Sequence, residues 1–593
     1  MSRSISLRFV CVLALAWALI PNLVAAQPEA PAAETPAAET PAAAADPEPE
    51  EAPVPAPTEP TPPLEATDDA PTPTPTPAPT PTPTEAEDDA PPARTEVDLE
   101  AWLEASPPFH APEVELEEEG PPSYEPFFTL GGEYRFRLNA MSDIPLRPLP
   151  RTDPASSGQL GQNYWAEQWL RLRMQTGFRP ELRLIAEGDV LYGVAFGDLA
   201  QGTSTAMWPR DEYGYPGIRL RHLYLEWLTP VGLLRLGQMG FSWGLGMVAN
   251  GGDQQPVFGD YRYGDLVRRA LFAIKPDGLE SPYAIGVGFD WVAWDQTADF
   301  ERRGDVALQG LLAFQYDDTA KRNTVGAYVA YRHQENRLGD VLDVVVGDVF
   351  ARWHVEDGTG GRLFAALEAA YIRGETTFAR TNERERQDVE QLLGVLQLGR
   401  LHPDIDLVLE TGYASGDSDT YDAIQSRGTF DPDHRVGLIM FSEVLAAQTA
   451  RAAHLAQSDA LVARPSRGAE LIPTNGGVAG AFYLFPYAIW RPWEWIEGRL
   501  GGVFGYATSD VVDPYAQQAL SESQNFRGGD PRQRELGFEI DASILLHGDL
   551  TDDLVLSGGV EGGLYLPGAA LNDAAGDGLG PIGLVRARLG LSL

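Results

Sequence analysis

Apolar and polar residues alternate along the chain from residue 127 to the last residue. In FFTLGGEYRFRLNA (127–140), Phe128, Leu130 and Phe136 fall on one face of an extended chain, and Glu133 and Arg135 fall on the other. The final segment, PIGLVRARLGLSL (581–593), repeats the pattern. A period of two is typical of β-strands whose two faces meet different environments. The body of the chain is therefore predicted to be all-β.

This alternation predicts eighteen strands. We place them at 127–140, 163–179, 181–193, 217–229, 231–243, 266–275, 282–294, 306–317, 322–333, 341–356, 361–374, 388–401, 404–415, 478–490, 494–507, 534–547, 552–566 and 581–593.

The links between these strands alternate in length. TPVG (229–232) and HPD (402–404) are short and contain turn-forming residues, whereas 141–162, 244–265 and 416–477 are long. Short turns at one end and long loops at the other are typical of bacterial outer-membrane barrels. A span built of strands has to close on itself, because hydrocarbon offers no partners for backbone N–H and C=O groups. The sequence predicts a single transmembrane antiparallel β-barrel of about eighteen strands over 127–593, with a water-filled lumen.

The segment before the barrel has two parts. Residues 1–26 have the pattern of a secretory signal peptide, with Arg3 and Arg8 around the start of an apolar run and small residues before Gln27. Residues 27–126 are rich in Pro, Ala, Thr and Glu, and they hold twenty-five acidic residues against one basic residue, Arg94. This composition cannot bury enough apolar surface to fold, so we expect a disordered acidic arm.

The location of both chain ends follows from the strand number. An even number of strands returns the chain to the side where it started, which is the periplasm in the outer membrane of a Gram-negative bacterium. There the arm is either a solvated spacer or a docking segment, through Trp102 and Leu103, for a periplasmic protein or peptidoglycan.

The sequence offers little support for catalysis. Cys11 is the only cysteine and lies in the predicted signal peptide, so disulfides and thiolate metal sites are not expected. A phosphate-binding glycine loop and a His-Glu-x-x-His motif are both missing. His434, close after Asp431 and Asp433, is the best local candidate for a catalytic group. We expect no enzyme and no cofactor, and the net charge of −20 over residues 127–593 disfavours nucleic-acid binding.

The longest link, 416–477, carries two further features. FSEVLAAQTARAAHLAQSDALVA (441–463) has apolar residues at helical spacing and predicts a short helix on or inside the barrel mouth of an extracellular loop. Asp417, Asp419 and Asp422 could bind Ca²⁺, because carboxylate oxygens are the ligands that this ion prefers. The segment lacks the glycine and the distal glutamate of an EF-hand loop. Turn formation by Asp and Gly is the alternative explanation.

One wall of the predicted barrel is rich in arginine. The last strand of a closed barrel pairs with the first, so inward positions of four neighbouring strands come together. They include Arg135, Arg137, Arg171, Arg173, Arg183, Arg586 and Arg588. Guanidinium groups match carboxylate and sulfate groups on a passing polymer. The same wall carries Glu133, Glu167, Glu187 and Asp189, so an internal ion-pair network is the alternative.

Three longer stretches resemble a known family, the alginate-export-like outer-membrane porins. They are RHLYLEWLTPVGLLRLGQMGFSWGLGM (221–247), ETGYASGDSDTYDAIQSRGTFDPDH (410–434) and LGFEIDASILLHGDLTDDLVLSGGVEGGLYLPGAAL (536–571). The resemblance implies an eighteen-stranded barrel that passes anionic sugar polymers or small solutes.

We therefore expect a passive outer-membrane channel, with an anionic polysaccharide leaving through it as the first hypothesis. A general or substrate-selective porin for small solutes is the second. The third, of another class, is a structural anchor in the outer-membrane lipid whose arm contacts a periplasmic partner.

Overall fold

The computed structural model describes residues 125–147, 158–179, 181–203, 219–260, 264–278, 281–318, 321–378, 385–458, 461–462, 467–551 and 554–593. The predicted signal peptide (1–26) and nearly all of the predicted arm (27–126) lie outside the described residues. Glu125 and Pro126, the last two residues of that arm, already belong to the first strand.

The described residues form one sheet of nineteen strands, of which eighteen are long and antiparallel. The long strands are β1 (Glu125–Met141), β2 (Tyr164–Arg179), β3 (Leu182–Gly197), β4 (Arg219–Thr229), β5 (Gly232–Gly240), β6 (Leu266–Ile274), β7 (Tyr283–Trp294), β8 (Val306–Asp318), β9 (Asn323–Glu335), β10 (Val341–Glu356), β11 (Arg362–Thr376), β12 (Gln387–Leu401), β13 (Ile405–Ala414), β15 (Ala481–Trp493), β16 (Ile496–Ala507), β17 (Glu535–Thr551), β18 (Leu554–Pro567) and β19 (Ile582–Ser592). The remaining strand, β14 (Ile424–Gln425), pairs with β12 in parallel and is not part of the wall.

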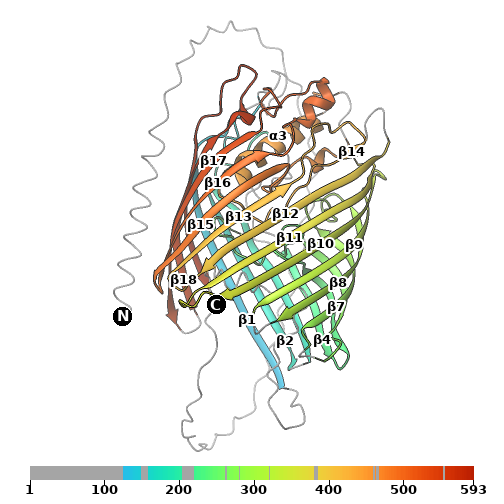
Figure 1. Ribbon diagram of the computed structural model, residues 1–593, viewed down its shortest axis with the longest axis vertical. Coiled ribbons are helices and arrows are strands. Elements are labelled where there is room, and N and C mark those ends of the chain that lie inside the picture. Colours follow the sequence, from blue (N-terminus) through green and yellow to red (C-terminus); the bar gives the residue numbers. More distant parts are fainter. Residues whose placement is uncertain are drawn as a thin grey trace, which may run out of the picture. The chain divides into compact units, whose positions relative to one another are not determined.

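The sheet closes into a barrel because β19 pairs with β1. Their register runs from Glu133 opposite Ser592 to Met141 opposite Leu584. Figure 1 shows the tilted strands side by side around the barrel, with the blue β1 beside the red C-terminal strands. The predicted fold class and all eighteen predicted strands are confirmed, with strand ends that differ by at most four residues.

The exterior of the barrel is apolar. Along β8, the outward side chains of Val306, Leu308, Leu312 and Phe314 are 36–57% exposed, whereas Ala307 between them is buried. A closed barrel that faces lipid has large apolar side chains turned outward in this way all around its wall. No helix in the described part of the chain is long and apolar enough to span a membrane.

The two ends of the barrel differ as predicted. Short turns follow β2, β4, β10, β12, β15 and β17, and long links follow β1, β3, β5, β13, β16 and β18. The prediction of a water-filled lumen is corrected, because a buried apolar cluster occupies much of the interior. Its members come from inward strand positions and from several links. Most of the link members belong to the links after β5 and after β13, which fold into the barrel rather than away from it.

The outward apolar surface generates a prediction. Leu312 lies in the middle of β8 and is 57% exposed. In lipid vesicles, Leu312→Arg should lower the free energy of unfolding of the barrel by about 2–4 kcal/mol, because the substitution exposes a charged side chain to the hydrocarbon of the membrane. Leu338→Arg, in the exposed link after β9, is the matched control and should be close to neutral. Equal effects of the two substitutions would contradict the assignment of the β8 outer face to lipid.

Candidate functional site in the barrel lumen

Two inward loops fill much of the lumen, and we name them by their residues. The 241–265 loop follows β5, and the 427–478 loop follows β14. The first buries an unusual series of large apolar side chains, which are Phe241, Trp243, Leu245, Met247 and Phe258. The second buries Phe430, Val436, Leu438, Ile439, Met440, Phe441 and Val444. Both loops therefore have the composition of a core, although they connect strands.

The 427–478 loop contains the helix that the sequence predicted. A π-helical turn, η1 (Met440–Leu445), continues into helix α3 (Ala446–Gln457), which is the orange helix at the upper end of the barrel in Figure 1. Nearly every α3 side chain is buried, and half of its residues are alanine, so the helix fits into the limited space. Its Gln448 side chain donates to the carbonyl of Pro145 (2.8 Å) and Arg451 to the carbonyl of Gly202 (2.6 Å), both in long links. The extracellular position of this loop stays a prediction.

Glutamates of the barrel wall hold the inward loops by accepting backbone N–H groups. Glu539 on β17 accepts from Leu438 (2.6 Å), Ile439 (2.8 Å) and Met440 (2.6 Å). In the same way, Glu368 on β11 accepts from Leu245. These N–H groups are buried where no strand can pair with them, and an unpaired buried N–H is costly. Carboxylate acceptors give the stronger, charge-assisted form of the bond.

The two inward loops also contact each other. Asp431 donates its backbone N–H to the carbonyl of Met247 (2.8 Å), and Asp433 accepts from the backbone N–H of Gly264 (2.7 Å). Gly264 has φ +61°, and a Cβ there would lie 1.9 Å from the carbonyl carbon of Gly251, so only glycine fits this contact. The loops thus form one packed unit.

His434, the sequence candidate for catalysis, belongs to this unit. Its Nδ1 donates to the carbonyl of Leu245 (3.0 Å), and its Nε2 lies 3.4 Å from both Tyr483 Oη and Glu410 Oε1. The ring is buried, and it joins the two inward loops to β13 and β15. Its place supports a structural role.

The predicted arginines lie on four neighbouring strands, and most of them contact an acidic side chain. Their lining of a conducting pore stays a prediction. Of the predicted residues, Arg137 lies 2.7 Å from Glu167, and Arg586 lies 3.1 Å from Glu561. The remaining contacts are Arg135 with Glu133, Arg171 with Asp189 (2.8 Å), Arg173 with Glu187 (4.0 Å), Arg183 with Glu226, and Arg588 with the carbonyl of Gly259 (3.5 Å). The side chains of Arg173 and Arg183 are 48% and 29% exposed, whereas those of Arg135, Arg137, Arg171 and Arg586 are at most 15% exposed. Internal ion pairs, the alternative explanation, therefore account for most of this wall.

Two aspartates that the sequence did not assign complete these contacts. Asp260 pairs with Arg135 and with Arg137 (3.2 Å), and Asp253 lies 3.4 Å from Arg221 and 4.0 Å from Arg171. Both come from the 241–265 loop. Alternation along a strand shows which face a side chain takes, but it cannot show what a distant loop brings to that face.

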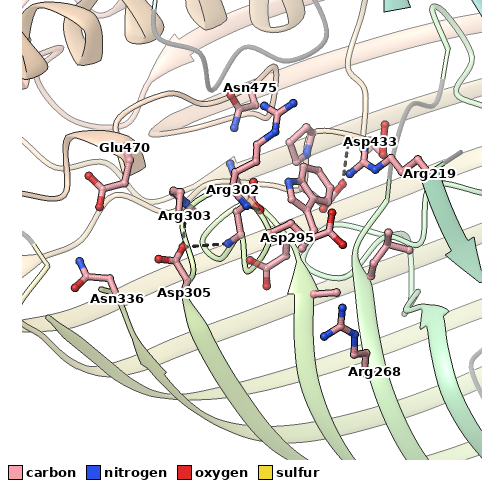
Figure 2. A pocket seen from close by; sticks show the side chains of 18 of the residues that line it. Arg219, Arg268, Asp295, Arg302, Arg303, Asp305, Asn336, Asp433, Glu470 and Asn475 are labelled. Atoms are coloured by element: carbon pink, nitrogen blue, oxygen red, sulfur yellow. Dashed lines mark hydrogen bonds and ion pairs between the residues drawn. The ribbon is translucent and has the colours of Figure 1, made fainter. Parts of the chain in front are cut away.

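A cavity of about 870 Å³ lies beside the inward loops. Figure 2 shows Arg302, Arg303 and Asp305 on one side of it and Arg219 and Asp433 on the other. Its lining includes six arginines, Arg219, Arg268, Arg302, Arg303, Arg337 and Arg435. It also includes seven acids, Asp295, Asp299, Glu301, Asp305, Asp431, Asp433 and Glu470. The arginines come mainly from links, so strand periodicity gave no signal for them.

A second cavity, of about 290 Å³, lies against β10, β11 and β12. Asp295, Gln296 and Asp431 line both cavities. Burial, together with the charge of Asp295, raises the pKa of Asp265 well above its usual range, and burial with the charges of Asp265 and Asp433 does the same for Asp431. The carboxyl groups of Asp265 and Asp431, at or near the junction of the cavities, therefore stay protonated at pH values where an exposed aspartate is ionised.

The candidate calcium ligands have other contacts. Asp417 accepts the N–H groups of Asp419 (3.0 Å) and Ser426 (3.1 Å), and Asp422 accepts that of Ile424 (2.7 Å). These are turn contacts, and calcium binding there stays a prediction. Within the described residues, the carboxylates and imidazole that come close enough to share a cation are Glu187, His222 and Asp253. Arg221 Nε lies 3.3 Å from Glu187, so a guanidinium already neutralises that cluster.

Comparisons with known proteins add only a general likeness. No family model and no curated protein matches the chain. Among solved structures, Pseudomonas aeruginosa OpdK with vanillate is 11% identical with a TM-score of 0.45, covering 78% of this chain and 98% of OpdK. Pseudomonas aeruginosa OccK2 (OpdF) is 9% identical with a TM-score of 0.44, covering 79% and 97%. Likeness at these scores is too low to transfer a solute to this chain, and the alginate-export-like resemblance rests on the quoted motifs alone.

The wall glutamates generate a prediction. Glu539→Gln removes the charge that holds three backbone N–H groups, and hydrogen bonds to charged groups contribute about 1.5–3 kcal/mol. Amide hydrogen exchange at Leu438, Ile439 and Met440 should therefore accelerate by about tenfold or more. Glu497→Gln is the control, because Glu497 is a buried wall glutamate that pairs with Arg491 (3.0 Å) and Arg499 (2.5 Å). Unchanged amide exchange at these three residues in Glu539→Gln would show that apolar packing alone holds the 427–478 loop in the lumen.

Proposed function

We propose that the protein is a passive outer-membrane channel for small polar and charged solutes. The observation that carries this proposal is the combination of an apolar exterior with two cavities inside a closed barrel, the larger of which is lined by many charged side chains. The cavities meet at Asp295, Gln296 and Asp431 and run beside the inward loops. A volume of about 870 Å³ suits a solute of drug-like size.

Export of an anionic polysaccharide is the second candidate. The arginine wall and the resemblance to alginate-export-like porins favour it. The 427–478 loop disfavours it, because a polymer needs a continuous opening and α3 is buried inside the barrel. In this second candidate, both inward loops have to leave the lumen before the polymer passes.

The structural-anchor hypothesis assigns no use to the cavities. A planar lipid bilayer separates it from the other two, since an anchor carries no current and a channel gives discrete conductance steps. Liposome swelling with uncharged sugars of increasing size then distinguishes a small-solute path, which has a sharp size limit, from a polymer duct.

Charges of the first cavity should set ion selectivity. Arg337→Glu combined with Arg435→Glu reverses two of its six arginines. The reversal potential in a salt gradient should move toward cation preference, most strongly at low salt, where screening is weakest. Arg532→Glu is the control, because its side chain is 79% exposed and pairs with Asp530 outside the cavity. Equal shifts in both variants would place the conducting path elsewhere.

Selectivity should also depend on pH. The raised pKa of Asp265 and Asp431 means that both are neutral at low pH and ionise only as the pH rises well above about 4, where an exposed aspartate titrates. Ionisation adds negative charge at the junction of the cavities, so cation preference should increase with pH. Asp265→Asn combined with Asp431→Asn should abolish this increase. A wild-type selectivity that is flat with pH would contradict the assignment.

A further inference from the structure

The contacts of Asp253 and Asp260 resemble those of a bound ligand. Asp260 is 3% exposed, and both of its carboxylate oxygens face arginines of β1, with Oδ1 at Arg135 and Oδ2 at Arg137 (3.2 Å). Burial alone raises its pKa, but Arg135, Arg137, Arg588 and Arg586 together lower it below the usual range. Asp253 lies at a second arginine pair, Arg171 and Arg221. A forked guanidinium pair around one carboxylate is the arrangement by which proteins bind acids.

The 241–265 loop is attached to the wall by other contacts. Leu245 donates its backbone N–H to Glu368, and Gly259 donates to Glu561 (3.1 Å). The buried aromatic and aliphatic side chains of the loop add apolar packing. These contacts hold the backbone without using either aspartate side chain, so the position of the loop does not depend on the aspartates.

Space is present beside Asp260. A cavity of about 40 Å³ is lined by Asp260, Gln255 and four arginines, which are Arg135, Arg137, Arg499 and Arg588. Two wall glutamates, Glu133 and Glu497, also line it and pair with Arg135 and Arg499. Space of this size holds about one water molecule. Withdrawal of the Asp260 side chain would leave room for a carboxylate from another molecule among the same guanidinium groups.

We infer that the arginine wall is a binding site for solutes with two or more carboxylates, and that Asp253 and Asp260 occupy it until such a solute replaces them. This inference rests on the proposed channel function for its purpose, but the binding itself does not require conduction. The aspartates act as an internal competitor, which lowers the apparent affinity by the fraction of time that they fill the site. A solute that displaces both moves two acidic side chains away from the wall and widens the path, while the backbone of the 241–265 loop stays attached to Glu368 and Glu561.

The test measures binding to the full-length protein in detergent by isothermal titration calorimetry, with tricarballylate as the probe. Asp253→Asn combined with Asp260→Asn removes the competitor, so tricarballylate should bind about tenfold more tightly than to the wild type. Asp260→Asn alone should give a smaller gain in the same direction. Glu470→Gln, which removes a negative charge from the 870 Å³ cavity, is the matched control and should bind like the wild type.

Equal affinity in the wild type and in both aspartate variants, with the barrel folded as judged by heat-modifiable mobility on gels, would overturn the inference. Weaker binding in the variants would also overturn it. Either result leaves the channel function standing, because conductance is measured separately. Titration with trigalacturonate distinguishes the source of the carboxylates. Tighter binding than tricarballylate points to uronate oligosaccharides, and weaker binding points to small organic acids.

Discussion

The lumen depends on one kind of interaction, the acceptance of loop backbone N–H groups by carboxylates of the barrel wall. A strand satisfies its backbone through its neighbours, but a loop inside a barrel has no neighbour strand to pair with. Glu539 supplies an acceptor for three consecutive N–H groups, and Glu368 and Glu561 supply acceptors for the other inward loop. Without these acceptors, the cost of burying the loop backbone would oppose the gain from burying its apolar side chains.

The arrangement of the rest of the interior depends on the two loops being held inside the barrel. Once the 427–478 loop and the 241–265 loop are inside, two cavities remain along their sides, and link residues such as Arg435 and Asp431 line the larger one. The same loops bring Asp253 and Asp260 to the arginine wall. The interior of an eighteen-stranded barrel, which would otherwise be wide, is thus narrowed, and its charges come from loops as well as from the strands of the arginine wall.

The strands could be predicted from the sequence because period two and turn residues are local signals. The helix within 441–463 could be predicted for the same reason, although its burial on all sides could not. The arginine wall was found because β1, β2, β3 and β19 must be neighbours in a closed barrel. Its partners Asp260 and Asp253 were missed, since a contact across the lumen leaves no periodic trace. The apolar composition of FSWGLGMVA (241–249) was the available signal that this link turns inward.

The most direct test of the account is the single-channel conductance of a variant whose lumen is cleared. Replacing residues 436–457, which include η1 and α3, with a short Gly/Ser linker removes the buried part of the 427–478 loop and leaves every wall strand intact. If the seated loop narrows the barrel, the conductance of this variant in a planar bilayer should rise several-fold over the wild type. An unchanged conductance, in a protein that still folds and inserts, would contradict the account.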